Sequence, residues 1–311
     1  MNTNTILLSF RFLTILLTSL TCYATEDTKH PLTEIIVTAI RVTNDVPAGT
    51  YTSLTSNLRY NPIVELQSRG MPEAQSDVTV RGGLFENTGF KIGAATIIDP
   101  QTGHYSIDLP ISLSASISNI ALGIDNALNG FNATMATVQY KIDQISPGGK
   151  FSVGFGNDSM NFQSLEGAID SRQSSRGNTS YKLGAARSSG DGTIDDGDHQ
   201  FKRFNFQMQH TSNQAQTDLI LGYQDKFYAW PGAYTGFAIY PETDHTKTLL
   251  ALVNHKKETS NGWWEMAGFY RRLRDDYDYD RKTKESGLPG SFDHETRVYG
   301  ASIQARINSR D

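Results

Sequence analysis

From about residue 150 to its end, the chain alternates apolar and polar residues along runs of about ten. In FKRFNFQMQH, residues 201–210, Phe204, Phe206 and Met208 share one side, and Asn205 and Gln207 share the other. VYGASIQARI, residues 298–307, repeats this period of two. Successive side chains of a strand point to opposite faces, so this part is predicted to be an antiparallel sheet. About eight strands are expected, at residues 151–156, 161–170, 180–188, 201–211, 217–228, 246–256, 263–274 and 295–308.

This pattern suits either a soluble sandwich with one wet face or a transmembrane barrel. Segments of about ten residues match the length of a tilted membrane strand, and aromatic residues gather near strand ends at 227–230 and 263–264, as in an interfacial girdle. Barrels of this kind combine tight turns at one end with long loops at the other. Short turns are expected at 157–159, 211–214 and 260–262, and long polar loops at 188–199 and 228–245. We favour the barrel.

Residues 1–24 have the pattern of a cleaved signal peptide. Arg11 supplies positive charge, FLTILLTSL is a short apolar core, and small residues precede a cleavage site after Ala24. The apolar core is shorter than the roughly 20 residues of a membrane-spanning helix. Lipidation of Cys22 is the alternative, but the residues before it lack the usual leucine and small-residue pattern. Export is therefore expected, followed by a polar lead at 25–60.

Residues 61–150 differ from the region that follows. Short strand-like runs such as DVTVRGG, FKIGAATIIDP and ATVQYKID are separated by turn residues. In 117–129 the apolar residues have mixed spacing, with Ile117, Ile120, Ile124 and Leu128 at helical offsets. A small α+β domain is expected, with its own core.

Composition limits the function. A net charge of −5 with 20% charged residues is not the basic footprint of a nucleic-acid-binding protein. The single cysteine, Cys22, leaves no structural disulfide in the exported chain. His104, Ser106 and Asp108 alternate along one strand without triad geometry, and no phosphate loop, HExxH or CxxC spacing occurs. An enzyme is not expected.

Three blocks, in this order, resemble TonB-dependent outer-membrane receptors, most closely the branch that includes vitamin B12 transporters. They are SDVTVRGGLFENT, DPQTGHYSIDLPIS and ALNGFNATMATVQY, followed by GYQDKFYAWPGAYTGFAIYPETDHTKT and GWWEMAGFYRRLRDDYDYDR. The resemblance covers about residues 60–310. It implies an α+β plug at 61–150 followed, at 151–311, by antiparallel transmembrane β-barrel strands, about eight of an expected 22 or so.

The resemblance also implies partners. Glu34-Ile35-Ile36-Val37-Thr38-Ala39 resembles the TonB box, a segment captured by strand addition to an inner-membrane energy-transducing protein; an ordinary first plug strand is the alternative. Outer-membrane lipid and the barrel-assembly machinery are the other expected partners. The expected location is the outer membrane of a Gram-negative cell, and the expected ligand is a large scarce compound, cobalamin-like or an iron–siderophore.

Candidate site residues follow from the resemblance and from loop composition. Arg81-Gly82-Gly83 is expected to latch the plug to a barrel carboxylate, with Glu265 one candidate. Trp230, Tyr234 and Phe237 are candidates for contact with a flat ligand, or else girdle aromatics. Four loop carboxylates are candidate ligands for Ca²⁺, with a solvated loop as the alternative: Asp191, Asp195, Asp196 and Asp198.

Two departures from the family pattern bear on function. Leu122-Gly123-Ile124-Asp125 stands where the family commonly has Arg-Gly-Pro, so a second latching arginine is missing. About eight strands are also too few for a barrel that encloses a plug, which predicts a fragment of a longer receptor. The alternatives are a truncated, transport-inactive remnant and a plug acting as a soluble periplasmic binding module.

Overall fold

The computed structural model describes residues 55, 58, 61–69, 74–111, 119–130, 133–171, 177–235, 240–283 and 290–308. Residues 44–311 form one compact unit, and residues 1–43 are assigned to another. The expected signal peptide and the TonB-box-like segment therefore lie outside the described residues.

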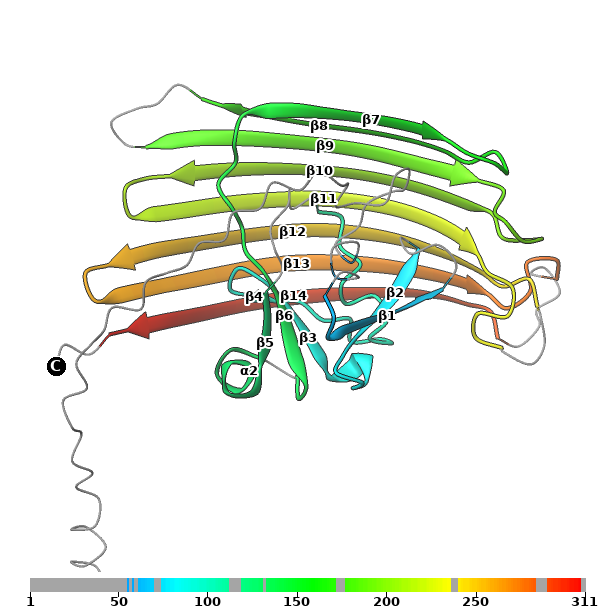
Figure 1. The fold of residues 1–311 in the computed structure, drawn as a ribbon, viewed down its shortest axis with the longest axis horizontal. Helices are drawn as coiled ribbons and strands as arrows, with labels where there is room; N and C mark the ends of the chain where they lie inside the picture. The colour runs from blue at the N-terminus through cyan, green and yellow to red at the C-terminus, as the bar shows by residue number, and fades with distance from the viewer. Residues whose placement is uncertain are drawn as a thin grey trace, which may run out of the picture. The chain divides into compact units, whose positions relative to one another are not determined.

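Eight antiparallel strands form one sheet in chain order, each paired with the next in sequence (Figure 1). Their bounds are β7 (Gly148–Phe155), β8 (Asn161–Asp170), β9 (Asn178–Gly190), β10 (His199–Thr211), β11 (Ala215–Ala229), β12 (Thr243–Thr259), β13 (Gly262–Asp278) and β14 (Phe292–Ile307). All eight predicted strands are present. Most extend beyond their predicted ends, because cross-strand pairing continues into residues without clear alternation.

The polar face of this sheet is covered and its apolar face is exposed. On β10, Asn205, Gln207 and Gln209 are buried, whereas Phe204 on the other face is 46% exposed. On β14, Ile303 is 71% exposed. A soluble sandwich buries its apolar faces, so the arrangement contradicts that alternative. It matches barrel strands, which turn apolar side chains to lipid and polar ones to the interior.

The connections divide between the two ends of the sheet. Because successive strands are antiparallel, the connections at 156–160, 191–198, 230–242 and 279–291 lie at one end, called here the long-loop end. Those at 171–177, 212–214 and 260–261 lie at the other, the short-turn end. The prediction for 157–159 was therefore wrong in one respect: this turn is short, but it lies at the long-loop end.

The region predicted to be the plug contains two small sheets. An antiparallel pair is formed by β1 (Val64–Arg69) and β2 (Gln75–Val80). A four-stranded mixed sheet has the order β4 (Ala95–Thr96), β3 (Thr88–Ile92), β6 (Ala136–Tyr140) and β5 (Asn119–Leu122). Among the described residues of this region, the helical elements are the short η2 (Phe85–Asn87) and α2 (Gly123–Asn129). No helix among the described residues is long and apolar enough to cross a membrane.

The described part of the segment 117–129, whose apolar spacing is mixed, contains both a strand and a helix. Its second half forms α2, but residues 119–122 form β5 and pair antiparallel with β6. Ile120 pairs with Val138 and Leu122 with Ala136. Tertiary pairing of a short apolar run has overridden its helical spacing, which is ambiguous over so few residues.

One apolar core joins the plug to the polar face of the sheet. Ile97, Ile107 and Ile111 of the plug are fully or almost fully buried, in the same cluster as Leu250 and Leu252 of β12. Gly222 on β11 permits this approach, because a Cβ there would lie 2.1 Å from the carbonyl oxygen of Pro110. The plug is therefore packed directly against the strands.

Candidate functional site

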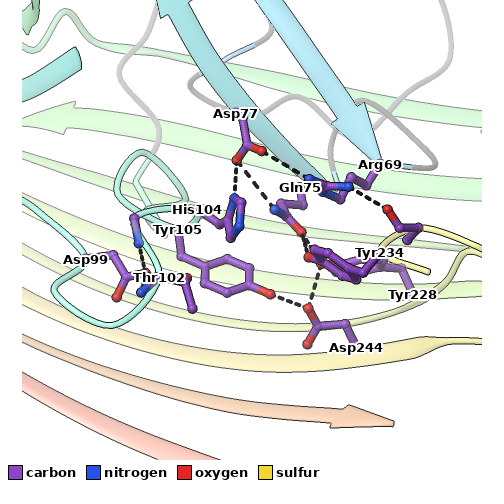
Figure 2. Close-up of polar contacts among 12 residues, drawn as sticks. Arg69, Gln75, Asp77, Asp99, Thr102, His104, Tyr105, Tyr228, Tyr234 and Asp244 are labelled. Atoms are coloured by element: carbon purple, nitrogen blue, oxygen red, sulfur yellow. Dashed lines mark hydrogen bonds and ion pairs between the residues drawn. The ribbon is translucent and has the colours of Figure 1, made fainter. Parts of the chain in front are cut away.

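A buried carboxylate lies where the plug meets the long-loop end of the sheet. Asp244, at the start of β12, is 2% exposed. Its Oδ2 accepts hydrogen bonds from the hydroxyls of Tyr105 in the plug and of Tyr228 on β11, the latter at 2.8 Å (Figure 2). Burial raises the pKa of the Tyr105 hydroxyl well above its ordinary value, and the nearby Asp244 charge adds to the effect. Tyr105 therefore stays a proton donor at neutral pH.

The apex of the plug carries a second polar group beside this carboxylate. Asp77 on β2 lies 2.8 Å from His104 Nδ1 and 3.6 Å from the Arg69 guanidinium (Figure 2). The guanidinium lies 4.3 Å from the ring centre of Tyr234, in the loop between β11 and β12. The Tyr234 hydroxyl bonds to Gln75 of β2. Charge and ring stacking thus connect the plug apex to a long loop.

That loop is organised around Glu242. This side chain is 2% exposed, and its carboxylate accepts hydrogen bonds from the backbone N–H groups of Tyr234 and Thr235, each at 3.1 Å, and from the Tyr277 hydroxyl at 2.9 Å. Several donors on one carboxylate fix the course of the chain around it. Tyr234 is therefore held over the plug while the residue remains 41% exposed.

Below the apex, cations on the sheet bind the plug. Lys226 Nζ on β11 lies 2.7 Å from Asp108 Oδ2, with the two side chains 1% and 12% exposed. Gln224 Nε2 donates to the other oxygen of Asp108 at 2.8 Å. On β13, Arg271 donates to the carbonyl oxygen of Tyr105. Buried charges are costly unless paired and hydrogen-bonded, so these pairs define a specific seat for residues 105–108.

A further polar set lies nearer the short-turn end. Lys91 Nζ on β3 donates to Gln304 Oε1 at 2.8 Å, and Gln304 Nε2 donates to Glu265 Oε2 at 2.8 Å. Burial lowers the pKa of Lys91, and the negative charge of Glu265 partly opposes this. Asn254 Oδ1 accepts from the backbone N–H of Ala94 at 3.0 Å. Strands β12, β13 and β14 thus hold the second plug sheet.

The segment that leaves the plug is also fixed to the sheet. Gln209 on β10 donates to the Asp143 carbonyl at 2.9 Å and accepts from the Ile145 N–H at 2.8 Å. Gln216 donates to the Ile142 carbonyl at 3.0 Å. Both glutamines also donate to Asp218, which is fully buried. The connection from plug to first strand is therefore part of the same interface.

Aromatic rings form a continuous series across the long-loop end. Centroid distances are 4.6 Å for Phe85–His104, 6.1 Å for His104–Tyr234, 5.5 Å for Tyr234–Tyr277, 5.1 Å for Tyr277–Phe292 and 4.4 Å for Phe292–His294. The series runs from the plug apex to β13 and β14. Rings of this kind contact flat or apolar ligands through their faces.

The expected latch at Arg81 differs from the arrangement found. Arg81 is exposed, with φ of +52°, and forms no ion pair with a described residue. Gly82 follows with φ of +69°, so residues 81–83 make a tight turn. Glu265 lies instead beside Asn254 and Gln304. The suggested Arg81–Glu265 pair is not present, and Lys226 and Arg271 make the charged contacts.

The three candidate ligand aromatics have different positions. Tyr234 lies over the plug apex, as described. Trp230 is half-buried at the start of the same loop, and its backbone N–H donates to the Glu242 carbonyl at 3.1 Å. Phe237 lies outside the described residues.

Three of the four candidate calcium ligands make other contacts. Asp196 lies 2.7 Å from Lys282 Nζ, Asp198 pairs with Arg281, and Asp191 accepts a hydrogen bond from Ser159. Hydrogen bonding to Asp198 raises the pKa of Arg281. Within the described residues, no group of three or more His, Cys, Asp or Glu side chains is arranged to hold a metal ion. Asp196 and Asp198 instead join loop 191–198 to the loop after β13.

Sequence reasoning missed Lys226 and Arg271, although their positions on the alternating strands could have identified them. By alternation, Lys226 lies on the same strand face as Ile220 and Gly222. Arg271 lies on the same face as Ala267 and Leu273. A charge in phase with apolar or small residues is a candidate for a buried partner. Asp244 could have been found in the same way, next to Thr246 and Thr248 on one face.

An α+β unit packed on the polar face of consecutive antiparallel strands is the architecture of outer-membrane transport receptors. The chain is similar to the copper transporter OprC, with a TM-score of 0.65 and 13% identity over 86% of this chain and 42% of that one. It is also similar to the ferric citrate transporter FecA in unliganded form, with a TM-score of 0.57 and 12% identity over 83% of this chain and 42% of that one. A third similar structure is the alcaligin outer-membrane receptor FauA from Bordetella pertussis. Its TM-score is 0.52, with 15% identity over 73% of this chain and 37% of that one.

The chain thus has the fold of TonB-dependent outer-membrane receptors, over a plug and eight barrel strands. It spans less than half the length of these three proteins. No family model matches the sequence, and no curated protein matches it.

Proposed function

We propose that the chain is the plug and first barrel part of an outer-membrane receptor that imports a scarce compound. The observation that supports this most strongly is the plug seat, in which Lys226 and Asp108 pair within a buried interface. A plug held by such a specific set of contacts suits a channel that is closed at rest and opened on demand. The inside-out polarity of the strands supports placement in the outer membrane.

The ligand would bind at the plug apex below the long loops. The rings of Phe85, His104 and Tyr234 lie near the Arg69 guanidinium there, so the surface offers ring faces and positive charge. A large compound with a flat or aromatic part and polar substituents fits this chemistry. We propose a cobalamin-like compound or an iron–siderophore.

Energy would come from the inner membrane, because the outer membrane has no nucleotide supply. We propose that Glu34–Ala39 forms a strand against an energy-transducing partner, which then pulls the plug from its seat. The interface contains many polar contacts, and such contacts can be re-formed with water when they open. No catalysis is proposed.

Uptake in a strain that lacks its own receptors tests this function. Cells producing the chain would be supplied with labelled cyanocobalamin or a labelled ferric siderophore, with and without an uncoupler of the proton gradient. Energy-dependent uptake of either compound supports the proposal. Outer-membrane location without uptake, with the ligand still bound by purified protein, points to a transport-inactive remnant. A protein found only in the soluble periplasmic fraction contradicts the proposal.

A further inference from the structure

The outer face of the sheet carries a row of basic side chains near the long-loop end. Pairing places one residue from each of the strands β9 to β14 in register: Arg187, Lys202, Asp225, Lys247, Arg274 and Glu295. The next row toward the short-turn end adds Arg272 and Arg297, which are directly paired. These six cations, called here the basic row, are Arg187, Lys202, Lys247, Arg272, Arg274 and Arg297.

Strand alternation directs the basic row away from the plug. Lys226 and Gln224 contact the plug, so Asp225 between them faces outward. Arg271 contacts the plug and Leu273 is buried, so Arg272 and Arg274 face outward as well. Lys202 is exposed and follows Phe201, which is fully buried. The side chains of the basic row therefore do not contribute to the contacts that hold the plug.

On its short-turn side, the basic row borders apolar side chains of the outer face. In register with Arg272 lie Leu249, Tyr223, Phe204 and Leu165, called here the apolar band. Phe204 is 46% and Leu165 56% exposed. Cations at one edge of an exposed apolar band match the depth at which lipid phosphates meet acyl chains.

The two acidic residues in the row leave most of these cations available. Asp225 lies 2.8 Å from His245, and Glu295 accepts from Arg274 at 2.6 Å and from Arg297. Arg187, Lys202, Lys247 and Arg272 form no ion pair with a described residue. At the short-turn end, the described outward strand positions carry a single Lys or Arg, Lys257. The basic charge is thus concentrated at one end.

We propose that the basic row binds a lipid with a multiply phosphorylated headgroup, its acyl chains lying along the apolar band. Neighbouring strands lie about 4.8 Å apart, so cations on β9, β10, β12 and β13 are spaced to engage more than one phosphate of a single headgroup. Arginine adds bidentate geometry to such contacts. This inference rests on the proposed outer-membrane function, because it requires the outer face to lie in a bilayer.

The test measures lipid binding by the full chain, extracted from membranes in an uncharged detergent. Native mass spectrometry would follow titration with a bis-phosphorylated glucosamine-disaccharide lipid. A dephosphorylated lipid of the same acyl composition and free inorganic phosphate form separate arms. We expect binding of the phosphorylated lipid, little binding of the dephosphorylated one, and no competition from millimolar phosphate. Equal binding of the two lipids, or full competition by phosphate, would overturn the proposal.

Matched variants locate the site. Lys202→Gln with Lys247→Gln should weaken binding about 30-fold, which corresponds to about 1 kcal/mol for each lysine. Lys257→Gln removes the outward charge at the short-turn end and should change binding less than about 2-fold, against about 5-fold for Lys202→Gln or Lys247→Gln alone. Equal losses at the two ends would mean unspecific charge attraction and contradict the site. Lys202→Arg with Lys247→Arg should retain binding, which separates lost charge from lost folding.

The experiment distinguishes failure of the lipid-binding proposal from failure of the proposed receptor function. Membrane fractions are separated before extraction, so absence of the chain from the outer membrane counts against the proposed function. Presence there without selective retention of the phosphorylated lipid counts against the basic row alone.

Discussion

Lys226 on β11 and Asp108 in the plug form a buried ion pair at 2.7 Å, which crosses the interface between the sheet and the plug. Lys226 also donates to the carbonyl oxygen of Ala74, so one ammonium group holds two plug segments. Lys226 thus joins the strand wall to the segment after β4, which contains Asp108, and to Ala74, which immediately precedes β2.

Removing the cation should loosen the plug. In Lys226→Met, Asp108 keeps its bond to Gln224 but loses its counter-charge, so we expect the plug seat to be destabilised by about 3 kcal/mol. Hydrogen exchange of the amides in 97–111, followed by mass spectrometry, should become faster. Lys226→Met with Asp108→Leu should restore most of the protection, because no unpaired charge remains. Unchanged exchange in the single variant would contradict this role.

Gly222→Ala tests the close approach of plug and wall. The new Cβ would lie 2.1 Å from the Pro110 carbonyl oxygen, so the backbone must move, at a cost of about 1–3 kcal/mol. Gly268→Ala is the matched control on the outer face, where the nearest atom would be 3.9 Å away. Protease cleavage within the plug should rise in the first variant only. Equal cleavage in both would argue against direct packing.

Tyr105 should make plug stability sensitive to alkaline pH. Burial raises its pKa well above the unfolded value of 10.0. Its stabilising contribution is therefore full below pH 10.0 and is lost as the pH rises through the folded pKa. The wild-type advantage over Tyr105→Phe in free energy of unfolding, about 1.5–3 kcal/mol at neutral pH, should shrink above pH 10. Denaturant titrations at several pH values measure it, and a constant difference up to pH 12 would exclude this assignment.

Tyr234 should contribute to ligand binding through its ring. We expect Tyr234→Ala to weaken binding of cyanocobalamin or a ferric siderophore about 10-fold, as expected for a lost ring contact. Tyr234→Phe keeps the ring and should stay within about 2-fold. Fluorescence titration of purified protein distinguishes the two. Equal affinities of all three forms would remove Tyr234 from the proposed ligand surface.

The strands could be predicted because their alternation is long and regular. In β10, thirteen residues pair with β9 and β11 at the phase expected from Phe204 and Asn205. The shorter segment at 119–122 could not be assigned, because four residues do not distinguish a strand from a helix. Pairing with β6 decided its structure.

The plug seat could be predicted only in outline. The resemblance predicted a plug arginine, Arg81, paired with a carboxylate on the barrel wall, whereas the charged contacts found place the cations on the wall and the acceptors in the plug. Arg81 is conspicuous in the sequence yet lies in an exposed turn, whereas Lys226 and Arg271 lie on strand faces whose partner is distant in the chain. Long-range register sets these pairs, and sequence phase alone shows only which positions face inward.

Capture of Glu34–Ala39 by an energy-transducing partner tests the central claim most directly. A Val37→Cys chain would be mixed in isolated outer membranes with the periplasmic domain of such a partner that carries a single cysteine in its edge strand, and disulfide formation would be scored after ligand addition. The account predicts a crosslink that Ile36→Pro abolishes, because proline removes a backbone donor from the added strand. No crosslink above that of a cysteine placed at Thr28, with the chain present in the outer membrane, would contradict it.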